Sequence, residues 1–249
     1  MRVIGYIDGL NFYEASKDKH WYPAGWCNWE KTLAAYCPGA DVSVRYFTTL
    51  YNGRDQTRVR RQKLHLLAMK EVARAEIVYG SCRERPITCP VCKAAIQCRC
   101  GCDRRFTEKM TDVNIAVHLL EDAVDRLFDR AYLVSGDVDL APAVHAVLRR
   151  APESQVVVLL PPESVMPDEF AKLERTFPRR SIARHLDLDR LQRFPDDLPR
   201  QWGMRLPPHW RANAGRRPAR PELETSLAHQ PGRPLSWFEE SVGYGTRPT

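Results

Sequence analysis

The stretch RVIGYIDGLN, residues 2–11, decides the fold of this chain. Its residues 3–7 form a nearly continuous apolar run that is too short for most helices, which predicts a strand buried on both faces, as in the middle of a parallel sheet. Asp8 ends this strand, so a carboxylate stands at the carboxyl end of a central strand, where open α/β sheets bind their ligands. Gly9 lets the chain turn away and a ligand come close, and Asn11 then lies within reach of the same place.

Composition and charge narrow the class of protein. The chain has 249 residues, enough for one large domain or for one domain with appendages, and its apolar fraction of 43% supports a real core. The formal net charge of +7 and the pI near 9.1 favour a polyanionic partner. No apolar segment is long enough to span a bilayer and no signal-peptide pattern precedes the first strand, so we expect a cytoplasmic protein without a membrane partner.

Beyond the first strand, the hydrophobic pattern alternates between strands and helices. Such alternation is typical of a parallel sheet with right-handed crossovers. From residue 195 onward, prolines and arginines replace the periodic pattern, so residues 195–249 are interpreted as a tail, partly docked or flexible, that follows a domain of residues 1–194. Further strands are predicted at residues 41–50, 77–79, 131–134, 155–160 and 181–185, and helices at residues 11–17, 29–36, 55–74, 111–127 and 140–150.

The helix after residue 111 shows the clearest amphipathic signal. Thr111 is expected to cap it, and apolar residues then recur with helical spacing. This stripe predicts the buried face of the helix, and its members are Val113, Ala116, Val117, Leu120, Val124 and Leu127.

Acidic residues gather where the strands of such a sheet end. Asp8 closes the first strand, and Asp137 and Asp139 follow the strand at residues 131–134. Asp112 begins the preceding helix, and Glu108 lies just before that helix. Strand carboxyl ends and the amino ends of the following helices share one edge of a parallel sheet, so these carboxylates converge if the two strands are neighbours.

Such a cluster is unstable without a counter-charge. Two unit charges about 4 Å apart repel by roughly 4 kcal/mol at an effective dielectric of 20, and protonation or a divalent cation relieves the repulsion. Oxygen ligands without histidine suit Mg²⁺ or Mn²⁺, which activate water and stabilise charge in phosphodiester hydrolysis. The alternative for each acid taken singly is a helix cap or a turn residue. The predicted ligands are Asp8, Asp112 and Asp137, with Asp139 and Glu108 as weaker candidates and Asn11 orienting a ligand or a water.

The sequence lacks the motifs of other folds that carry out phosphoryl transfer. The chain contains no GxxxxGK[ST] loop and no GxGxxG after a strand, which argues against a nucleoside triphosphatase or a dinucleotide enzyme. A haloacid-dehalogenase-type phosphatase would need a second Asp two residues after Asp8, where Leu10 stands.

Five of the eight cysteines fall within residues 89–102. Because disulfides are rare in the cytoplasm, this concentration favours a metal site. The CPVC group has the spacing of a zinc knuckle, and a closed Cys₄ site would be structural, inside an insert of residues 82–106. The alternative is a disordered insert with free thiols. Four of these five thiols are predicted to bind Zn²⁺: Cys89, Cys92, Cys98, Cys100 and Cys102.

Basic residues flank the predicted acidic site. The helix after the second strand begins on the same edge, and the insert adds further arginines. Such side chains position phosphates without reading sequence, although a solvated helix face explains any single arginine equally well. The predicted phosphate contacts are Arg58, Arg60, Arg61, Lys63, Arg104 and Arg105.

Three separated motifs resemble the NYN domain family (LabA-like), a branch of the PIN-like nuclease superfamily. They are YIDGLNFY at residues 6–13, EKMTDVNIAVHLLEDA at residues 108–123 and LVSGDVDLAPAV at residues 133–144, in the order of the family. The resemblance implies a PIN-like three-layer α/β/α sandwich with a central mostly parallel sheet, and metal-dependent cleavage of RNA. It implies Asp8, Asp112, Asp137 and Asp139 as the acidic residues of the site. Glu108 and Lys109 match the Glu-Lys pair of the family, and Lys109 is expected to contact nucleic acid. Some members of the family act instead as RNA-binding or regulatory modules.

The leading hypothesis is a metal-dependent endoribonuclease, a hydrolase of RNA phosphodiester bonds with a Mg²⁺ or Mn²⁺ site. One alternative is an RNA-binding or regulatory protein of the NYN fold with little or no catalysis. Another is a nuclease that cuts DNA. The sequence leaves open the natural substrate, the choice of zinc ligands and any homo-oligomeric state.

Overall fold

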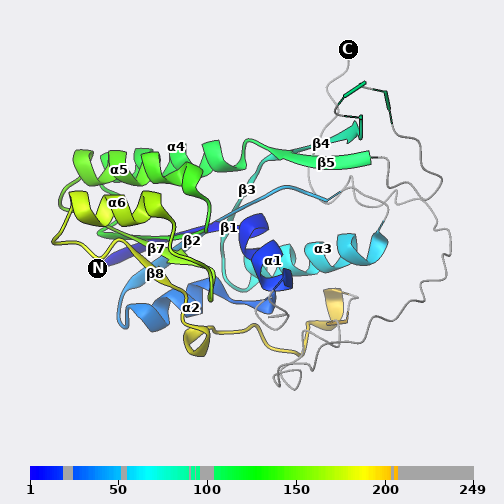
Figure 1. Ribbon diagram of the computed structural model, residues 1–249. Coiled ribbons are helices and arrows are strands. Elements are labelled where there is room, and N and C mark those ends of the chain that lie inside the picture. The colour runs from blue at the N-terminus through cyan, green and yellow to red at the C-terminus, as the bar shows by residue number, and fades with distance from the viewer. Residues whose placement is uncertain are drawn as a thin grey trace, which may run out of the picture. The chain divides into compact units, whose positions relative to one another are not determined.

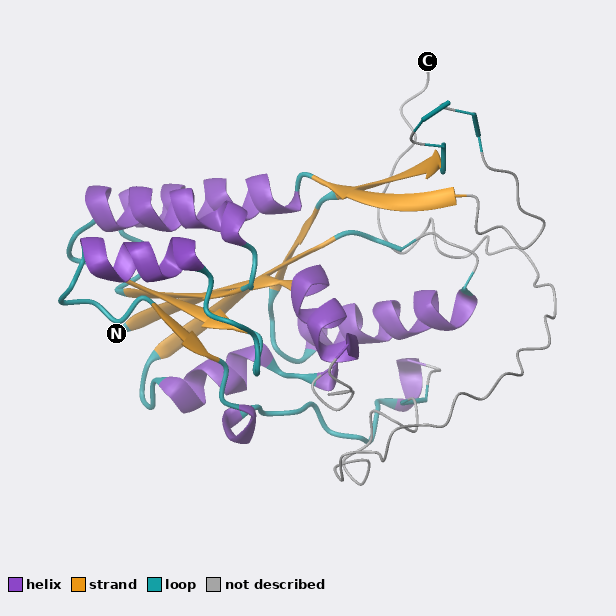
Figure 2. Ribbon diagram, in the orientation of Figure 1, coloured by secondary structure: helices purple, strands orange, loops and turns teal. Residues whose placement is uncertain are grey.

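The structure is a computed structural model, and it describes residues 1–18, 25–51, 55–89, 91–92, 94–95, 104–202 and 205–206. Six strands of this part of the chain form one sheet in which all pairings are parallel (Figure 2). They are β1 (Arg2–Asp8), β2 (Asp41–Thr48), β3 (Glu76–Tyr79), β6 (Arg130–Val134), β7 (Gln155–Leu160) and β8 (Ala183–His185), in the spatial order β3-β2-β1-β6-β7-β8.

Helices cover both faces of this sheet, which gives a three-layer α/β/α sandwich (Figure 1). The predicted α/β class with a parallel central sheet is confirmed. One face carries α1 (Gly9–Asp18), α2 (Trp29–Tyr36) and α3 (Gln56–Glu71), and the other carries α4 (Thr111–Val124), α5 (Ala141–Arg150) and α6 (Asp168–Thr176). Short 3₁₀ helices are η2 (Val138–Leu140), η3 (Leu188–Arg190) and η4 (Arg200–Trp202).

Strand β1 lies in the middle of the sheet between β2 and β6, as its apolar run predicts. Its side chains alternate between two cores. Ile7 packs in the cluster beneath α1–α3, whereas Ile4 and Tyr6 pack in the cluster beneath α4–α6. The chain runs outward from β1 to β3 and then returns to β6 on the other side of β1. Asp8 therefore ends its strand at the switch point of the sheet, where α/β folds bind ligands.

The buried face of α4 differs from the prediction, which was wrong. Val113 and Val124 are 64% and 61% exposed, whereas Ile115 is fully buried against the sheet. Two stripes of this helix are apolar, so periodicity alone does not select one of them. The stripe that contains Asp122 faces inward, because that carboxylate pairs with Arg45 of β2 (Nη1 to Oδ2, 2.7 Å).

The start of α4 also differs, because Thr111 is its first residue rather than its cap. Met110 precedes it in a left-handed conformation (φ 78°) and makes no side-chain capping bond. Thr111 Oγ1 instead donates to Glu108 Oε1 at 2.5 Å. This bond ties the end of the preceding strand to the first turn of the helix.

A second sheet is an antiparallel ribbon of β4 (Ser81–Pro86) and β5 (Arg104–Lys109), which extends beyond the edge strand β3 (Figure 1). It belongs to the predicted insert, and beyond β4 an isolated bridge pairs Thr88 with Ala95. Near the base of the ribbon, Glu108 lies opposite Cys82. The ribbon thus returns the chain to the carboxyl edge of the main sheet just before α4 begins.

The described chain beyond β8 runs back along the core. Phe194 and Leu206 are buried in the cluster beneath α1–α3, and Trp26 Nε1 donates to the carbonyl oxygen of Pro195 at 3.1 Å. Most of residues 195–249 lies outside the described residues, so the boundary after residue 194 stays a prediction. Within the described part, no helix has both the length and the apolar character needed to cross a membrane.

Candidate active site

Asp8 lies at the last position of β1 and is almost completely buried, with 3% exposed. Its Oδ1 accepts from the backbone N–H of Asn11 at 3.1 Å, and its Oδ2 accepts from Ser135 Oγ at 2.9 Å. Burial raises the pKa of Asp8 to about 7, and repulsion from Asp112 and Glu108 adds to this shift, although the two hydrogen bonds act in the opposite direction. Among the described residues, no lysine, arginine or histidine forms an ion pair with this carboxylate.

A hydrogen-bond network joins the ends of β1 and β6 around this carboxylate. Asn11 Oδ1 accepts from the N–H of Gly136 at 2.9 Å, and Ser135 Oγ accepts from the N–H of Asp137 at 3.0 Å. Asp137 Oδ1 in turn accepts from the N–H of Asp139 at 2.9 Å and caps η2. The loop after β6 is therefore fixed beside the end of β1.

The other predicted acids lie on this edge and interact electrostatically. Partial burial raises the pKa of Asp112, in the first turn of α4, and the charges of Asp137 and Asp139 raise it further. Burial and the charge of Asp112 likewise raise the pKa of Glu108, against the effect of its hydrogen bond with Thr111. Asp112 thus links the acids after β6 with those at the ends of β1 and β5.

These acids share an edge without forming a closed set of ligands. In the part of the chain that the structure describes, no three His, Cys, Asp or Glu side chains lie close enough to hold one metal ion. The donors are nevertheless suited to a hard cation, because they are all carboxylates. Burial raises their pKa values, and mutual repulsion raises these values further. Since hydrogen bonds fix Asp8, a shared ion requires the more exposed Asp112 and Asp137 to turn toward it.

Gly9 has a packing role that the sequence analysis did not foresee. A Cβ atom at this position would lie 2.6 Å from the ring of Tyr46, so only glycine lets α1 begin directly against that ring. Tyr46 is buried on β2 within electrostatic range of Asp8 and Glu108, and burial raises the pKa of its phenol. The ring therefore forms part of the apolar surroundings of the acidic rim.

One comparison identifies the family. The sequence matches the family model described as NYN domain over residues 3–177. The chain belongs to the NYN domain family. NYN domains belong to the PIN-like superfamily, and the family is typically nuclease-like. The match includes the three motifs and every acidic residue of the rim.

A comparison with solved structures finds a crystal structure of a protein of unknown function from Vibrio parahaemolyticus. It is 21% identical in sequence, with a TM-score of 0.47, and the alignment covers 77% of this chain and 96% of that chain. No curated protein matches the sequence.

A cavity of about 570 Å³ opens beside the acidic rim of this NYN domain. Arg58 of α3 lies over the ring of Tyr51, 4.3 Å from its centroid, and 5.5 Å from the centroid of Tyr13. Glu14 Oε1 is 3.3 Å from the same guanidinium. Glu108 also lines the cavity, so the aromatic and basic side chains adjoin the carboxylates.

The predicted phosphate contacts of the NYN domain occupy different surroundings. Arg58 and Arg61 line this cavity, and Arg60 is exposed on the same helix. Lys63 is half-buried, and desolvation, followed by the charge of Arg60, lowers its pKa. Lys109 is exposed at the end of β5. The side chains of Arg104 and Arg105 lie outside the description, so their role stays a prediction.

Two of the five predicted zinc ligands are described. The backbone N–H groups of Cys92 and Val91 hydrogen-bond to the sulfur of Cys89 and lower its pKa. A lowered pKa favours the thiolate, which is the form that binds metals. Cys98, Cys100 and Cys102 lie outside the described residues, so the zinc site of this NYN domain stays a prediction.

Two residues of this edge were missed by the sequence analysis. Ser135 hydrogen-bonds with both Asp8 and Asp137, and Tyr51 stacks with Arg58. Ser135 directly follows β6 and Tyr51 lies shortly after β2. The rule that strand carboxyl ends build the site of an α/β fold would have selected both.

Proposed function

We propose that the protein is a metal-dependent endoribonuclease that hydrolyses RNA phosphodiester bonds at the acidic rim. Asp8, Asp112 and Asp137 would hold Mg²⁺ or Mn²⁺, with Asp139 and Glu108 as further oxygen donors. The observation that carries this proposal is Asp8 itself: burial raises its pKa to about 7, and no lysine, arginine or histidine of the described chain forms an ion pair with it.

Groups of the chain orient the acidic rim and supply positive charge beside it. When bound, the cation supplies Lewis-acid stabilisation of phosphate oxygens and lowers the pKa of a water nucleophile. The backbone of Asn11 and the hydroxyl of Ser135 orient the carboxylate of Asp8 through their hydrogen bonds. Arg58 and Arg61 bring positive charge to the adjoining cavity, where they hold phosphates next to the reacting one.

The adjoining cavity favours an unpaired strand as substrate. Its volume of about 570 Å³ lies in the range of pockets that enclose a small ligand such as one nucleotide. Tyr13 and Tyr51 offer rings on which a base can stack. Bases of an RNA duplex are already stacked and paired, so only a splayed base can enter. The proposal therefore specifies single-stranded RNA or an unpaired loop.

A structural Zn²⁺ in the insert completes the proposal. Cys89 and Cys92 would bind it together with two of the three later cysteines. A closed tetrahedral site leaves no coordination position for substrate, so this ion would stabilise the insert and take no part in the hydrolysis. Elemental analysis of the purified protein is expected to find zinc, and Cys89→Ser is expected to lower its content.

Cleavage of an end-labelled single-stranded RNA by the purified full-length protein tests the main proposal. We expect cleavage with Mg²⁺ or Mn²⁺ and none with EDTA, and matched DNA and duplex RNA substrates define the preference. Asp8→Asn is expected to lower the rate at least about 100-fold, as does the loss of an electrostatic stabiliser in other active sites. Asp137→Asn is expected to act in the same direction.

Asp125→Asn is the matched control for these variants. Asp125 is an exposed acid at the carboxyl end of α4, away from the rim, and the substitution removes the same charge. It is expected to keep the wild-type rate. Melting temperatures of all three variants separate loss of activity from loss of fold. Cleavage that survives both Asp8→Asn and Asp137→Asn would falsify the assignment of the acidic rim as the active site.

The second candidate is an RNA-binding protein of the same fold that does not cut. The absence of a three-ligand cluster among the described side chains favours it. It predicts RNA binding that weakens steeply with salt, no cleavage with either cation, and the same RNA affinity for wild type and Asp8→Asn. The cleavage assay and a binding titration together separate the two candidates.

A further inference from the structure

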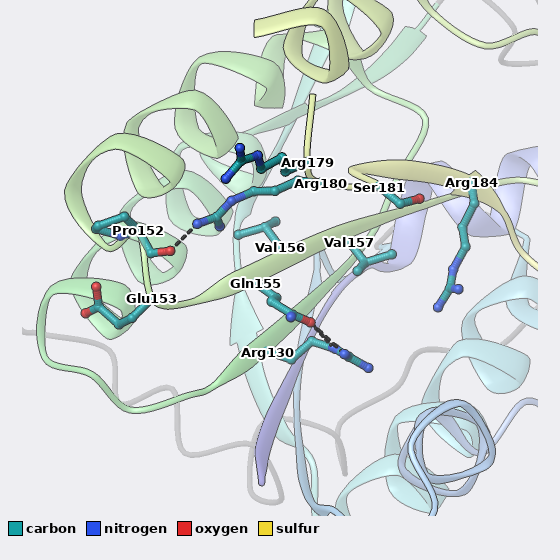
Figure 3. Close-up of a pocket in the computed structure, with 10 residues that line it drawn as sticks. All are labelled: Arg130, Pro152, Glu153, Gln155, Val156, Val157, Arg179, Arg180, Ser181 and Arg184. Atoms are coloured by element: carbon teal, nitrogen blue, oxygen red, sulfur yellow. Dashed lines mark hydrogen bonds between the residues drawn. The ribbon is translucent and has the colours of Figure 1, made fainter. Parts of the chain in front are cut away.

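A second cavity, of about 520 Å³, lies at the opposite end of the sheet (Figure 3). It is lined by residues at the amino ends of three strands: Arg130 begins β6, Gln155 begins β7, and Arg184 is the second residue of β8. We call it the arginine groove, because Arg179 and Arg180 line it as well. A strand of seven residues such as β1 spans roughly 20 Å, so the groove and the acidic rim are separate sites.

Hydrogen bonds to neutral acceptors hold two of these arginines in place. Arg130 donates to Gln155 Oε1 from Nε at 2.8 Å and from Nη2 at 2.5 Å. Arg180 donates from Nη1 to the carbonyl oxygen of Ser154 at 2.6 Å and from Nη2 to that of Pro152. Both guanidinium groups are therefore oriented without their charge being neutralised.

Aromatic rings hold a third guanidinium. Arg184 Nη2 lies 3.3 Å from the hydroxyl of Tyr132, to which it donates, and its guanidinium is 5.1 Å from the ring centroid of Tyr36. In Figure 3 the guanidinium groups of Arg130 and Arg184 lie toward one end of the groove, and those of Arg179 and Arg180 toward the other. The groove thus offers two positively charged ends.

Positive charge exceeds negative charge in the groove, because four arginines and one glutamate are among its described lining residues. Over the described chain, none of its four arginines forms an ion pair with a carboxylate. The one acid among its lining residues, Glu153, lies 3.7 Å from Arg126 instead. Preorganised positive charge without a partner is what an anion-binding site requires, because no charge pair has to be broken when the ligand arrives.

We propose that the arginine groove binds a phosphate-bearing ligand of nucleotide size. The planar guanidinium forks match phosphate oxygens in bidentate geometry, and several arginines suit a multiply charged phosphate better than a single carboxylate. The cavity volume lies in the range of small-ligand pockets. The half-buried Val157 supplies apolar surface for a base or a ribose. Free nucleotides and RNA share this phosphate chemistry, so the experiment separates the two sources.

Isothermal titration of the full-length protein in EDTA tests the groove. EDTA removes metal-dependent binding at the acidic rim, and the groove variants separate binding here from binding at Arg58 and Arg61. The probes are pyrophosphate, ADP, adenosine and a single-stranded RNA tetranucleotide. At least one phosphate-bearing probe is expected to bind, and adenosine is not. Arg184→Gln and Arg179→Gln are each expected to weaken the affinity about tenfold or more, the effect of losing a charge-assisted contact.

Lys70→Gln is the control, since Lys70 is an exposed cation in the last turn of α3. This variant is expected to bind the phosphate-bearing probes with the wild-type affinity. Arg179 makes no hydrogen bond or ion pair with another described side chain, so its variant tests the groove without loosening the fold. Binding of ADP alone assigns the groove to free nucleotides, and binding of the tetranucleotide alone assigns it to RNA. The proposal is overturned if no phosphate-bearing probe binds at millimolar concentration, or if both arginine variants keep the wild-type affinity.

Discussion

Two buried carboxylates, Asp8 and Asp122, have opposite surroundings in this fold. Asp122 is 4% exposed, accepts from the hydroxyl of Tyr6 at 2.5 Å, and has Arg45 Nη1 2.7 Å from its Oδ2. Asp8 is 3% exposed, and among the described residues its hydrogen-bond donors are neutral: the amide of Asn11 and a serine hydroxyl. Tyr6 and Asp8 lie two positions apart on β1, so a single strand borders both environments.

The difference distinguishes an acid with a structural role from the acid that we propose to be catalytic. Burying a carboxylate is costly unless a positive charge or strong hydrogen bonds compensate it. The fold supplies that charge to Asp122 through Arg45, whereas no described residue supplies it to Asp8, and burial raises the pKa of Asp8 instead. A buried acid left in this condition at the switch point of an α/β sheet is best explained by a ligand that completes it.

The largest effect on stability is expected at the compensated acid. Asp122→Ala leaves the hydroxyl of Tyr6 without an acceptor, and it leaves Arg45 with the exposed Glu76 but without its buried partner. We expect a loss of about 3–5 kcal/mol in the free energy of unfolding, the usual result of breaking a buried ion pair. Urea denaturation followed by tryptophan fluorescence measures it, with Asp125→Asn as control. A loss below about 1 kcal/mol would show that the pair contributes little.

A pH-dependent effect of similar size is expected at the uncompensated acid. The pKa of Asp8 is about 7 in the metal-free fold and about 3.9 in an unfolded chain. The folded protein holds this proton more tightly, so the contribution to stability is full below about pH 4 and is lost as the pH rises to about 7, on the order of 4 kcal/mol. Because asparagine does not ionise, Asp8→Asn is expected to abolish this pH-dependent loss of stability.

Urea denaturation of wild type and Asp8→Asn in EDTA, across this pH range, tests the direction of the effect. The free energy of unfolding of Asp8→Asn, minus that of wild type, is expected to grow from about pH 4 to about pH 7 and then to stay level. Other groups that titrate in this range contribute equally to both proteins, so their effect cancels in the difference between the two free energies of unfolding. One such group is the half-buried His65, whose pKa is lowered by desolvation to about 4. Parallel curves for the two proteins would mean that Asp8 titrates normally.

A smaller loss is expected when only one hydrogen bond of the compensated acid is removed. Tyr6→Phe deletes the donor to Asp122 and keeps its ion pair with Arg45. We expect a loss of about 1.5–3 kcal/mol, typical of a hydrogen bond to a charged group. The double variant Tyr6→Phe/Asp122→Ala is expected to cost less than the sum of the single variants, because the two residues interact directly. Additive losses would contradict that coupling.

The smallest effect is expected from Ser135→Ala, beside Asp8. The substitution removes a hydrogen bond that lowers the pKa of Asp8, so this pKa is expected to rise above about 7. Stability is expected to change by about 1 kcal/mol. In the cleavage assay the pH of half-maximal rate should move upward, because the proposed reaction needs the carboxylate deprotonated. An unchanged pH profile would mean that Ser135 does not act through Asp8.

The features that were predictable from the sequence are those set by local pattern. A short apolar run that ends in Asp8 is sufficient to predict a central strand and a ligand-binding edge. The alternation of strands and helices predicts a parallel sheet with the acids on its carboxyl edge. Their convergence required β1 and β6 to be neighbours, a condition that the structure meets. Each of these conclusions follows from the chain direction and the strand order, without any side-chain geometry.

The features that were not predictable depend on contacts between distant segments. The inward face of α4 carries Asp122, whose partner Arg45 lies on β2 and is far away in sequence. Two apolar stripes on one helix look alike until such a partner is known. Ser135 acquires its role only because β6 lies beside β1. The separations among the rim carboxylates depend on rotamers, which no periodicity encodes.

The β4–β5 ribbon makes the cysteine-rich segment an exchangeable module. Its described strands pair with each other, from Ser81 and Lys109 at the base to Pro86 and Arg104 at the far end, and not with the six-stranded sheet. The stretch between residues 86 and 104 can therefore be shortened, lengthened or replaced while Glu108 keeps its position. Variation among related chains should concentrate in that stretch, and grafting a different tip offers a route to redirect the domain toward other partners.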